Sequence, residues 1–545
     1  MSAVLGITFG NTSSSIAVAS QDGKVDVIAN PDGDRSIPSV ISFVGTDEYF
    51  GTQAQSQLVR NAKNTIINFR DYVGKKFSDT DVSASKSGAK AVEAKNGQVG
   101  FEITKNGDKT EIISVSDISR THLKHLRLAA EDYSGKTIEG VVLTVPTDFN
   151  NEQKEELIKV AKSAGLKVLQ LINEPSAALM AHLSAQPDRL MEDKIFVVAD
   201  FGGIRSDAAV IAVRGGILTI LSTAHKHGLG GDELDDALSE YFAKEFEKKY
   251  KANPRSNARS LAKLKAESIV VKKTLSNVQT STCSIESLAE GIDFHTSINR
   301  LRYELTARNV FTEMTRFVES VVSKAGLDTL DIDEVLLVGG TSHTPKLAAN
   351  FSAIFPETTN IIAPALDPKA LNPSELVCRG AALQASLIQS FDESEIKESL
   401  SPIVVNTQHL SAPIGIKDVN GKFQTLLATE TAYPIKRSIQ VSNGESPAVL
   451  VSLYEGERTI HETVIESEKY SDDEEDDLSE EEPEVVKKVV YVPGKLLAEL
   501  SLKDLKPNSK LDITVNITHD GVLHFSGREL KQGSVAVKGE VLPTQ

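Results

Sequence analysis

The chain has 545 residues, too many for one small hydrophobic core, and 40% of them are hydrophobic and 25% charged, as in ordinary globular proteins. Its formal net charge of −17 disfavours direct nucleic-acid binding through a basic patch. Cys283 and Cys378 have no metal-ligand spacing, and no apolar run is long enough to span a bilayer. The first residues show no basic n-region, so no signal peptide is expected. A cytoplasmic protein with reduced thiols is therefore expected, without membrane contact.

Two segments, residues 4–18 and 197–211, have the same pattern of a buried strand, a glycine turn and a second strand. Glycines let backbone N–H groups approach an anion closely, and a nearby aspartate can hold its metal ion. The pattern therefore predicts paired phosphate-binding loops from a duplicated domain. The second segment carries the aspartate, Asp200, whereas the first has Thr8 in the matching place. A site that keeps its glycines and loses half of its acids predicts nucleotide binding without efficient turnover.

Short β-branched strands alternate with amphipathic helices from Val4 to about Ser390. Residues 140–146 precede an expected helix over 151–164, and residues 334–340 precede one that begins at Pro345. This alternation predicts α/β lobes whose sheets are covered on their faces. Ligands of such sheets bind beyond the carboxyl ends of the strands, where both glycine turns lie.

The pattern changes after about Phe391. Residues 391–407 form an expected interdomain linker, which contains a polar helix and then a short apolar run behind Pro402. Residues 408–545 follow as a separate β domain. Its expected strands are 423–427, 449–453, 511–517 and 522–525, the last two joined by the turn Asp520-Gly521.

An acidic insertion interrupts the β domain at about residues 466–488. Ten acidic residues and no basic ones lie between Asp472 and Glu484. Such a block buries too little apolar surface to order itself, so a solvated loop is expected. Ser471 and Ser479 each precede an acid by three residues and are candidate phosphorylation sites.

Seven motifs, in the family's order, resemble those of the cytosolic 70-kDa heat-shock chaperones of the actin/hexokinase ATPase superfamily. They are two phosphate loops at 6–12 and 200–207, a strand end at 145–150, a connecting segment at 172–178, a glycine turn at 228–235, an adenosine motif at 338–346 and a closing segment at 371–382. The resemblance implies an α/β, actin-like two-lobed nucleotide-binding domain over residues 1–390. A β-sandwich peptide-binding-like domain is implied to follow.

The resemblance also implies the ligand and the residues that hold it. The cofactor is expected to be ATP, with Mg²⁺ beside Asp200, Glu174 and Asp207, because this ion takes one or two carboxylates plus waters. The implied nucleotide-binding residues are Gly10, Asn11, Thr12, Gly202, Gly203, Gly230, Gly231, Lys272, Lys273, Ser276, Gly339, Gly340 and His343.

Several positions depart from the family pattern, and together they predict a degenerate ATPase with no catalytic residue. The departures are Thr8 for a metal-side aspartate, Asn11 for a threonine beside the γ-phosphate, Arg70 for the lysine that positions the attacking water, Arg205 for a second-loop threonine, Ile269 for a ribose-side glutamate and His343 for an arginine that stacks on adenine. One positioned donor can be worth ~10²–10³ in rate, so losing several together should abolish efficient hydrolysis.

The chain ends at Gln545, just after a strand-like segment at 535–537, so the family's helical lid is expected to be missing. This combination resembles a fungal, ribosome-associated subgroup that pairs with the J-domain protein zuotin. The resemblance implies a heterodimer that reaches the ribosome through its partner and stimulates a second, active chaperone. The β domain could accept an extended partner segment by strand addition. An active chaperone ATPase that binds unfolded clients, a sugar or carboxylate kinase, and a large exchange-type relative remain as alternatives.

Overall fold

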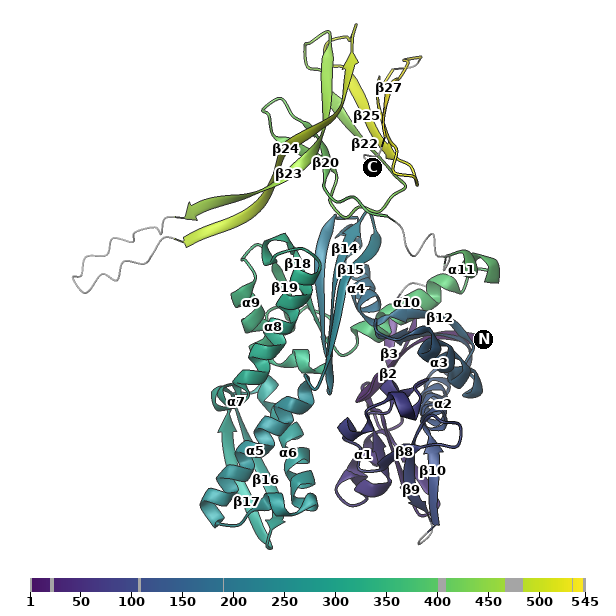
Figure 1. The fold of residues 1–545 in the computed structure, drawn as a ribbon, viewed down its shortest axis with the longest axis vertical. Helices are drawn as coiled ribbons and strands as arrows, with labels where there is room; N and C mark the ends of the chain where they lie inside the picture. Colours follow the sequence, from purple (N-terminus) through teal and green to yellow (C-terminus); the bar gives the residue numbers. More distant parts are fainter. Residues whose placement is uncertain are drawn as a thin grey trace, which may run out of the picture.

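The computed structural model describes residues 2–19, 24–105, 109–189, 191–399, 408–465, 484–531 and 533–542. Two α/β lobes lie side by side, and a β domain stands beyond one end of strands β14 (Arg205–Arg214) and β15 (Ile217–His227) (Figure 1). Lobe I is defined here as residues 2–189 and lobe II as residues 191–362.

Lobe I is built on a six-stranded sheet in the order β12-β11-β1-β2-β3, with β4 paired to β2. Smaller sheets, β6-β5-β7 and β10-β9-β8, and helices α1 to α4 complete the lobe. The bounds are β1 Ser2–Phe9, β2 Ser13–Ala19, β3 Val25–Ile28, β4 Ile37–Pro38, β5 Val40–Val44, β6 Asp47–Phe50, β7 Thr65–Ile67, β8 Lys90–Glu93, β9 Val99–Lys105, β10 Lys109–Ser114, β11 Thr137–Val145, β12 Val168–Asn173, α1 Gly51–Gln55, α2 Val115–Ser134, α3 Asn151–Ser163 and α4 Glu174–Ser184.

Lobe II repeats the main sheet of lobe I in the order β15-β14-β13-β18-β19. Helices α8 and α9 pack against this sheet, and the hairpin β16-β17 with helices α5 to α7 forms the rest of the lobe beyond one end of the sheet (Figure 1). The remaining bounds are β13 Lys194–Phe201, β16 Thr280–Ala289, β17 Ile292–Asn299, β18 Glu334–Val338, β19 Asn360–Ile362, α5 Gly231–Tyr250, α6 Ala258–Asn277, α7 Arg300–Thr306, α8 Arg308–Lys324 and α9 Pro345–Ile354. The expected helices over 151–164 and from Pro345 are confirmed as α3 and α9.

The two predicted hairpins are confirmed and have the same register. In lobe I, β1 is antiparallel to β2 and Thr8 stands opposite Ser15. In lobe II, β13 is antiparallel to β14 and Asp200 stands opposite Asp207. The paired positions that carry two carboxylates in one copy therefore carry two hydroxyls in the other.

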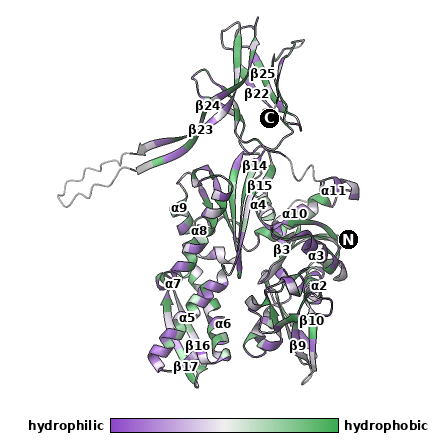
Figure 2. Cartoon of the chain, in the orientation of Figure 1, coloured by the Kyte–Doolittle hydropathy of each residue, from purple (hydrophilic) through white to green (hydrophobic). Residues whose placement is uncertain are grey.

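Helix α10 (Leu376–Ile388) joins the lobes: it packs against α4, β1 and β2 of lobe I, and its Leu376 and Val377 lie in one core cluster with Val198 and Leu336 of lobe II. The approach is so close that a Cβ at Gly380 would collide with the carbonyl oxygen of Ala177. The outer helices carry hydrophobic and hydrophilic residues on opposite faces, as α2 and α8 do (Figure 2). This one-sided pattern is what buries a helix against a sheet.

The β domain consists of two four-stranded antiparallel sheets, β21-β20-β23-β24 and β22-β25-β26-β27, that share one core. The core includes Leu453 and Leu500 from one sheet and Ile513 and Phe525 from the other, which is the packing of a β-sandwich. The bounds are β20 Ile414–Lys417, β21 Phe423–Leu427, β22 Ile435–Ser442, β23 Val449–Ile465, β24 Glu484–Leu502, β25 Lys510–Ile517, β26 Leu523–Glu529 and β27 Val537–Val541. Within the described part of the chain, no helix follows α11 (Glu393–Ser399).

Some sequence predictions for this domain shift or lie outside the described residues. Residues 484–488 belong to strand β24 instead of the acidic insertion, because they pair with the end of β23. The rest of the acidic block, with Ser471 and Ser479, and linker residues 400–407 lie outside the described residues. The last strand begins at Val537, two residues later than the strand-like segment in the sequence.

The β domain contacts lobe II through polar groups. Arg214, at the end of β14, is buried and donates from Nε to the carbonyl oxygen of Thr429 at 2.7 Å. Arg458 of β23 pairs with Asp331 at 2.8 Å and with Asp328 at 2.7 Å. The two contacts attach the β domain at the end of the central sheet and along the long β23-β24 hairpin.

Candidate functional site: a nucleotide cleft between the lobes

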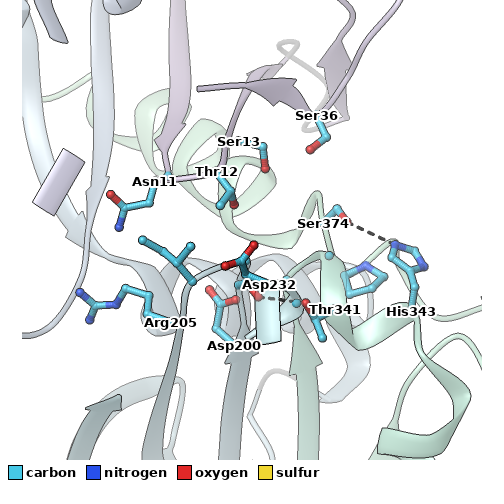
Figure 3. Close-up of a pocket in the computed structure, with 18 of the residues that line it drawn as sticks. Asn11, Thr12, Ser13, Ser36, Asp200, Arg205, Asp232, Thr341, His343 and Ser374 are labelled. Atoms are coloured by element: carbon cyan, nitrogen blue, oxygen red, sulfur yellow. Dashed lines mark hydrogen bonds between the residues drawn. The ribbon is translucent and has the colours of Figure 1, made fainter. Parts of the chain in front are cut away.

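A cavity of about 640 Å³ opens between the two lobes, where both glycine turns lie (Figure 3). This volume is within the usual range for small-molecule sites. Of the sixteen predicted site residues, all except Gly230 line it. They come from the turn after β1, the start of α4, the hairpin of β13 and β14, the start of α5, the face of α6 and the segment after β18. Residues more than 300 positions apart in the sequence are thus brought to one cleft.

The phosphate-loop candidates are held by backbone contacts. The amide of Gly231 donates to the carbonyl of Gly202 at 2.9 Å, and that of Asp232 donates to the carbonyl of Gly203 at 2.7 Å. Gly230 does not line the cavity. It packs against the second loop, where a Cβ would collide with the carbonyl oxygen of Gly203. The second loop and the start of α5 therefore form one surface of closely packed backbone. A helix N-terminus beside glycine turns is a favourable place for phosphate oxygens.

The residues expected to hold the base and ribose lie at the other end of the cavity. Lys272, Lys273 and Ser276 lie on α6, and Gly339, Gly340 and His343 follow β18. Gly339 has a φ of 84°, which favours glycine.

Three of these side chains have protein partners, and Ser276 Oγ donates to the carbonyl of Lys272 at 3.3 Å. Lys272 Nζ lies 2.8 Å from Asp235 Oδ1 and donates to the carbonyl of Gly231 at 2.7 Å. His343 Nε2 lies 3.1 Å from Asn372 Oδ1, and burial lowers the pKa of this histidine. These contacts fix Lys272 and His343 at the edge of the cavity.

The three candidate metal acids differ in their surroundings. Glu174, at the start of α4, accepts from Arg70 Nη1 at 3.0 Å, and burial raises the pKa of Glu174 to about 7. Asp207 accepts from Arg205 Nε at 2.7 Å. Asp200 has no hydrogen-bond or ion-pair partner among the described residues, and burial beside the other two acids raises its pKa to about 8. Asp200 is therefore the carboxylate left for a cation.

A buried charge network at the inner end of the cleft was only partly predicted. Arg205 Nη1 donates to Asp71 at 3.2 Å, and Arg205 Nη2 donates to Asp148 at 2.9 Å and also pairs with Asp207. Arg70 pairs with Asp71 at 2.8 Å. Burial alone would raise the pKa of Asp71, yet the two arginines hold it well below its usual range. Asp71 was missed in the sequence, although it adjoins Arg70, because nothing local identifies its partner 134 residues away.

The residues present fit a nucleotide. Thr8 Oγ1 and Asn11 Nδ2 are buried polar atoms without a partner among the described residues, and both residues line the cavity. Buried polar groups are nearly always hydrogen-bonded, so these two atoms indicate a polar ligand. Thr12 lies against Gly203 of the opposite loop, where a Cβ would collide with the threonine side chain. The two loops thus enclose space that side chains do not fill.

Known proteins place the chain in a family. The Hsp70 protein family model matches residues 4–471. The ribosome-associated complex subunit SSZ1 of Saccharomyces cerevisiae is 52% identical over 99% of this chain and 100% of its own length. A heat shock protein 70 homolog of Schizosaccharomyces pombe is 42% identical over 98% of this chain and 95% of its own length. The heat shock 70 kDa protein 14 of Danio rerio is 30% identical over 85% of this chain and 90% of its own length.

No helix in the described part of the chain is both long and apolar enough to cross a membrane.

Proposed function

The chain belongs to the Hsp70 family, and from that premise we propose that it is a cytoplasmic, ATP-binding, non-hydrolysing chaperone-like subunit of a ribosome-associated complex. In this proposal it pairs with a J-domain protein, reaches the ribosome through that partner and assists a second, active chaperone in folding nascent chains. The similarity to a ribosome-associated complex subunit along the whole chain supports this assembly.

The observation that carries the proposal is the state of Arg205. The family resemblance places a small hydroxyl residue here, beside the γ-phosphate. In this chain the position holds a buried guanidinium that three carboxylates share, Asp71, Asp148 and Asp207. The residue has neither a hydroxyl to donate to a phosphate nor freedom to move toward one, because leaving the site would strand buried charges.

The opposite loop has lost its share of the charge as well. Thr8 and Ser15 stand where lobe II has Asp200 and Asp207. Phosphoryl transfer depends on positioned metal, water and charge-matched donors, so a cleft with these exchanges should bind nucleotide and turn it over poorly.

Binding is less demanding, because many groups share it. The glycine residues of the two loops and the start of α5 line the part of the cavity where the phosphates would lie, and α6 with His343 would enclose the nucleoside. Asp200, together with water, would hold a Mg²⁺ ion, which would neutralise phosphate charge when bound.

The β domain is proposed to hold a segment of the J-domain partner. Its open sheets offer edge strands, to which an extended segment can add by main-chain hydrogen bonds. A stable, stoichiometric partner is expected instead of cycling clients.

Two measurements test the proposal. Copurification with the tagged full chain should yield a stoichiometric J-domain protein and ribosomes, and a single-turnover assay should show ATP bound without hydrolysis. The alternative, an active ATP-hydrolysing chaperone, is favoured by the retained Asp200 and Glu174. Family-like turnover in a clean preparation would establish that alternative.

A further inference from the structure

Arg205 links the two lobes directly. It begins β14 in lobe II and is 4% exposed, and its guanidinium reaches two carboxylates of lobe I. Asp71, in the 3-10 turn η3 (Arg70–Tyr72), accepts from Nη1 at 3.2 Å. Asp148, between β11 and α3, accepts from Nη2 at 2.9 Å. One buried cation therefore spans the inner end of the cleft.

Two histidines of lobe II face the same two carboxylates. His227 Nδ1 lies 3.7 Å from Asp71 Oδ2, and His225 Nε2 lies 3.6 Å from Asp148 Oδ2. Both histidines belong to β15, the strand next to β14. The end of the lobe II sheet thus presents three basic side chains to an acidic pair on lobe I.

A second bridge closes the outer end of the cleft. Lys86, which follows the 3-10 turn η5 (Val82–Ala84) of lobe I, pairs with Asp232 and, at 3.0 Å, with Glu233 on the first turn of α5. The lysine side chain is 43% exposed, so solvent screens this bridge. The Arg205 bridge is buried and is screened much less.

We propose that the Arg205 bridge, through Asp71 and Asp148, holds the two lobes together. The closure of the cleft is then set by the chain's own charges and not by bound nucleotide. Separating the lobes would break the two cross-lobe contacts of the guanidinium, with Asp71 and Asp148, and would leave only Asp207 of its own strand on Arg205 and only Arg70 of its own lobe on Asp71. Hinged clefts ordinarily close around a ligand that binds the closed form better. In this chain the closed form has its own cross-lobe contacts, so a ligand adds little to the equilibrium.

The Arg205 bridge and the cavity are present together. The cavity of about 640 Å³ is present with the Arg205 contacts in place. The guanidinium is turned to the side of the cleft away from Thr341 and His343 (Figure 3). A nucleotide can therefore occupy the cleft while the Arg205 bridge stays formed. The inference rests on the proposed function only for the identity of that nucleotide.

The test is the distance between the lobes in the full chain. Spin labels on the exposed positions of Arg60→Cys in lobe I and Lys248→Cys in lobe II report opening, while the native Cys283 and Cys378 are buried. The distance between the two labels is measured by double electron–electron resonance without nucleotide, with ADP, and with ATP and Mg²⁺. The expected result is one narrow distance distribution that is the same in all three conditions.

Two variants break the Arg205 bridge. Arg205→Gln and Asp148→Asn should each give a broader and longer distribution without nucleotide, which narrows when ATP is added. Asp148 is 24% exposed in its side chain, so its variant is the one expected to fold if Arg205→Gln does not. The matched control is Glu131→Gln, which removes an equally exposed carboxylate from an ion pair with Arg127 inside lobe I. It should leave the distribution unchanged.

Either of two outcomes overturns the inference. One is an unaltered chain that is broadly distributed until ATP is added. The other is a nucleotide-free Asp148→Asn chain that keeps the narrow distribution. Hydrolysis is assayed on the same samples, and turnover would contradict the proposed function without changing the distances, so the two ideas fail separately.

Discussion

Arg205 and Arg214 are the first and last residues of one strand, β14. Arg205 holds Asp71 and Asp148 of the opposite lobe, and Arg214 donates to the carbonyl of Thr429 in the β domain and to that of Lys194, at 2.7 and 2.9 Å. The strand between them is almost entirely buried in the lobe II sheet. A single rigid element therefore runs from the nucleotide cleft to the β domain, with a buried arginine at each end.

Restoring one acid should not restore hydrolysis. Thr8→Asp returns a carboxylate to the first loop, opposite Ser15, but leaves Arg205 and Asn11 unchanged. We expect single-turnover hydrolysis to stay within about threefold of the unaltered chain, whereas one missing group alone would be worth ~10²–10³. Thr110→Asp, at an exposed position of β10, controls for added charge. A rise of a hundredfold or more in Thr8→Asp would show that this single loss disables the site.

Acid should destabilise the fold through His122. This buried histidine bonds Ser14 Oγ at 2.9 Å, and Ser14 in turn bonds Ser39, which donates to the carbonyl of Gly10 at 2.8 Å. Burial lowers the pKa of His122 to about 3. Below the unfolded value of about 6.5, the unfolded chain binds a proton that the native chain refuses, so stability falls as pH falls toward 3.

The expected loss is ~1.4 kcal/mol per pH unit below about pH 6.5, or roughly 2 kcal/mol by pH 5. Urea unfolding of the unaltered chain and of His122→Asn at pH 7 and pH 5 measures it. The variant is expected to be less stable at pH 7 and to lack this part of the pH dependence. His295→Asn, at an exposed position of β17, should keep the full dependence. Equal slopes for the two variants would contradict the assignment.

The sequence was most informative where the signal is local. A strand, a glycine turn and a second strand follow one another within residues 4–18 and again within 197–211, and the structure gives both hairpins the predicted pairing. The order of the motifs then identified the family, which the comparisons confirm. Residues such as Lys272 and His343 were placed by their motifs, and both line the cleft.

The sequence was least informative where a residue's meaning depends on a distant partner. From the sequence, Arg205 was interpreted only as the loss of a hydroxyl group. The fold shows that its side chain pairs with Asp71 and Asp148 of the other lobe. The attachment of Arg214 to the β domain likewise has no local pattern. Strand boundaries near the acidic block were also missed, because pairing with β23 extends β24 back to Glu484 against the charge pattern.

Removing most of the acidic block should leave the fold intact. Deleting residues 471–483 takes away nine acids, changes the formal net charge from −17 to −8, and leaves a five-residue connection between Ile465 and Glu484. Those residues end β23 and begin β24, so a short loop can join them. Lower net charge relieves self-repulsion. The melting temperature should be unchanged or slightly higher, and a fall of about 5 °C or more would show that the block packs against the body.

Dissociation of the partner should be nearly independent of nucleotide. An ordinary member releases its client when nucleotide shifts the two domains between states. Here the Arg205 bridge holds the cleft closed. Strand β14 connects Arg205 rigidly to Arg214, which contacts the β domain. We expect the partner off-rate to differ by less than about threefold between ATP, ADP and no nucleotide, which is under ~0.7 kcal/mol.

Arg214→Gln supplies the counterpart of this prediction. It removes the charge that Thr429 and Lys194 share, so the β domain should loosen from lobe II and the partner off-rate should rise equally in all three nucleotide conditions. Arg528→Gln, which breaks an exposed pair with Asp512 inside the β domain, should change nothing. Surface plasmon resonance with the immobilised full chain gives the rates. A tenfold or larger dependence on nucleotide in the unaltered chain would mean that β14 still transmits the state of the cleft, as it would in a working chaperone.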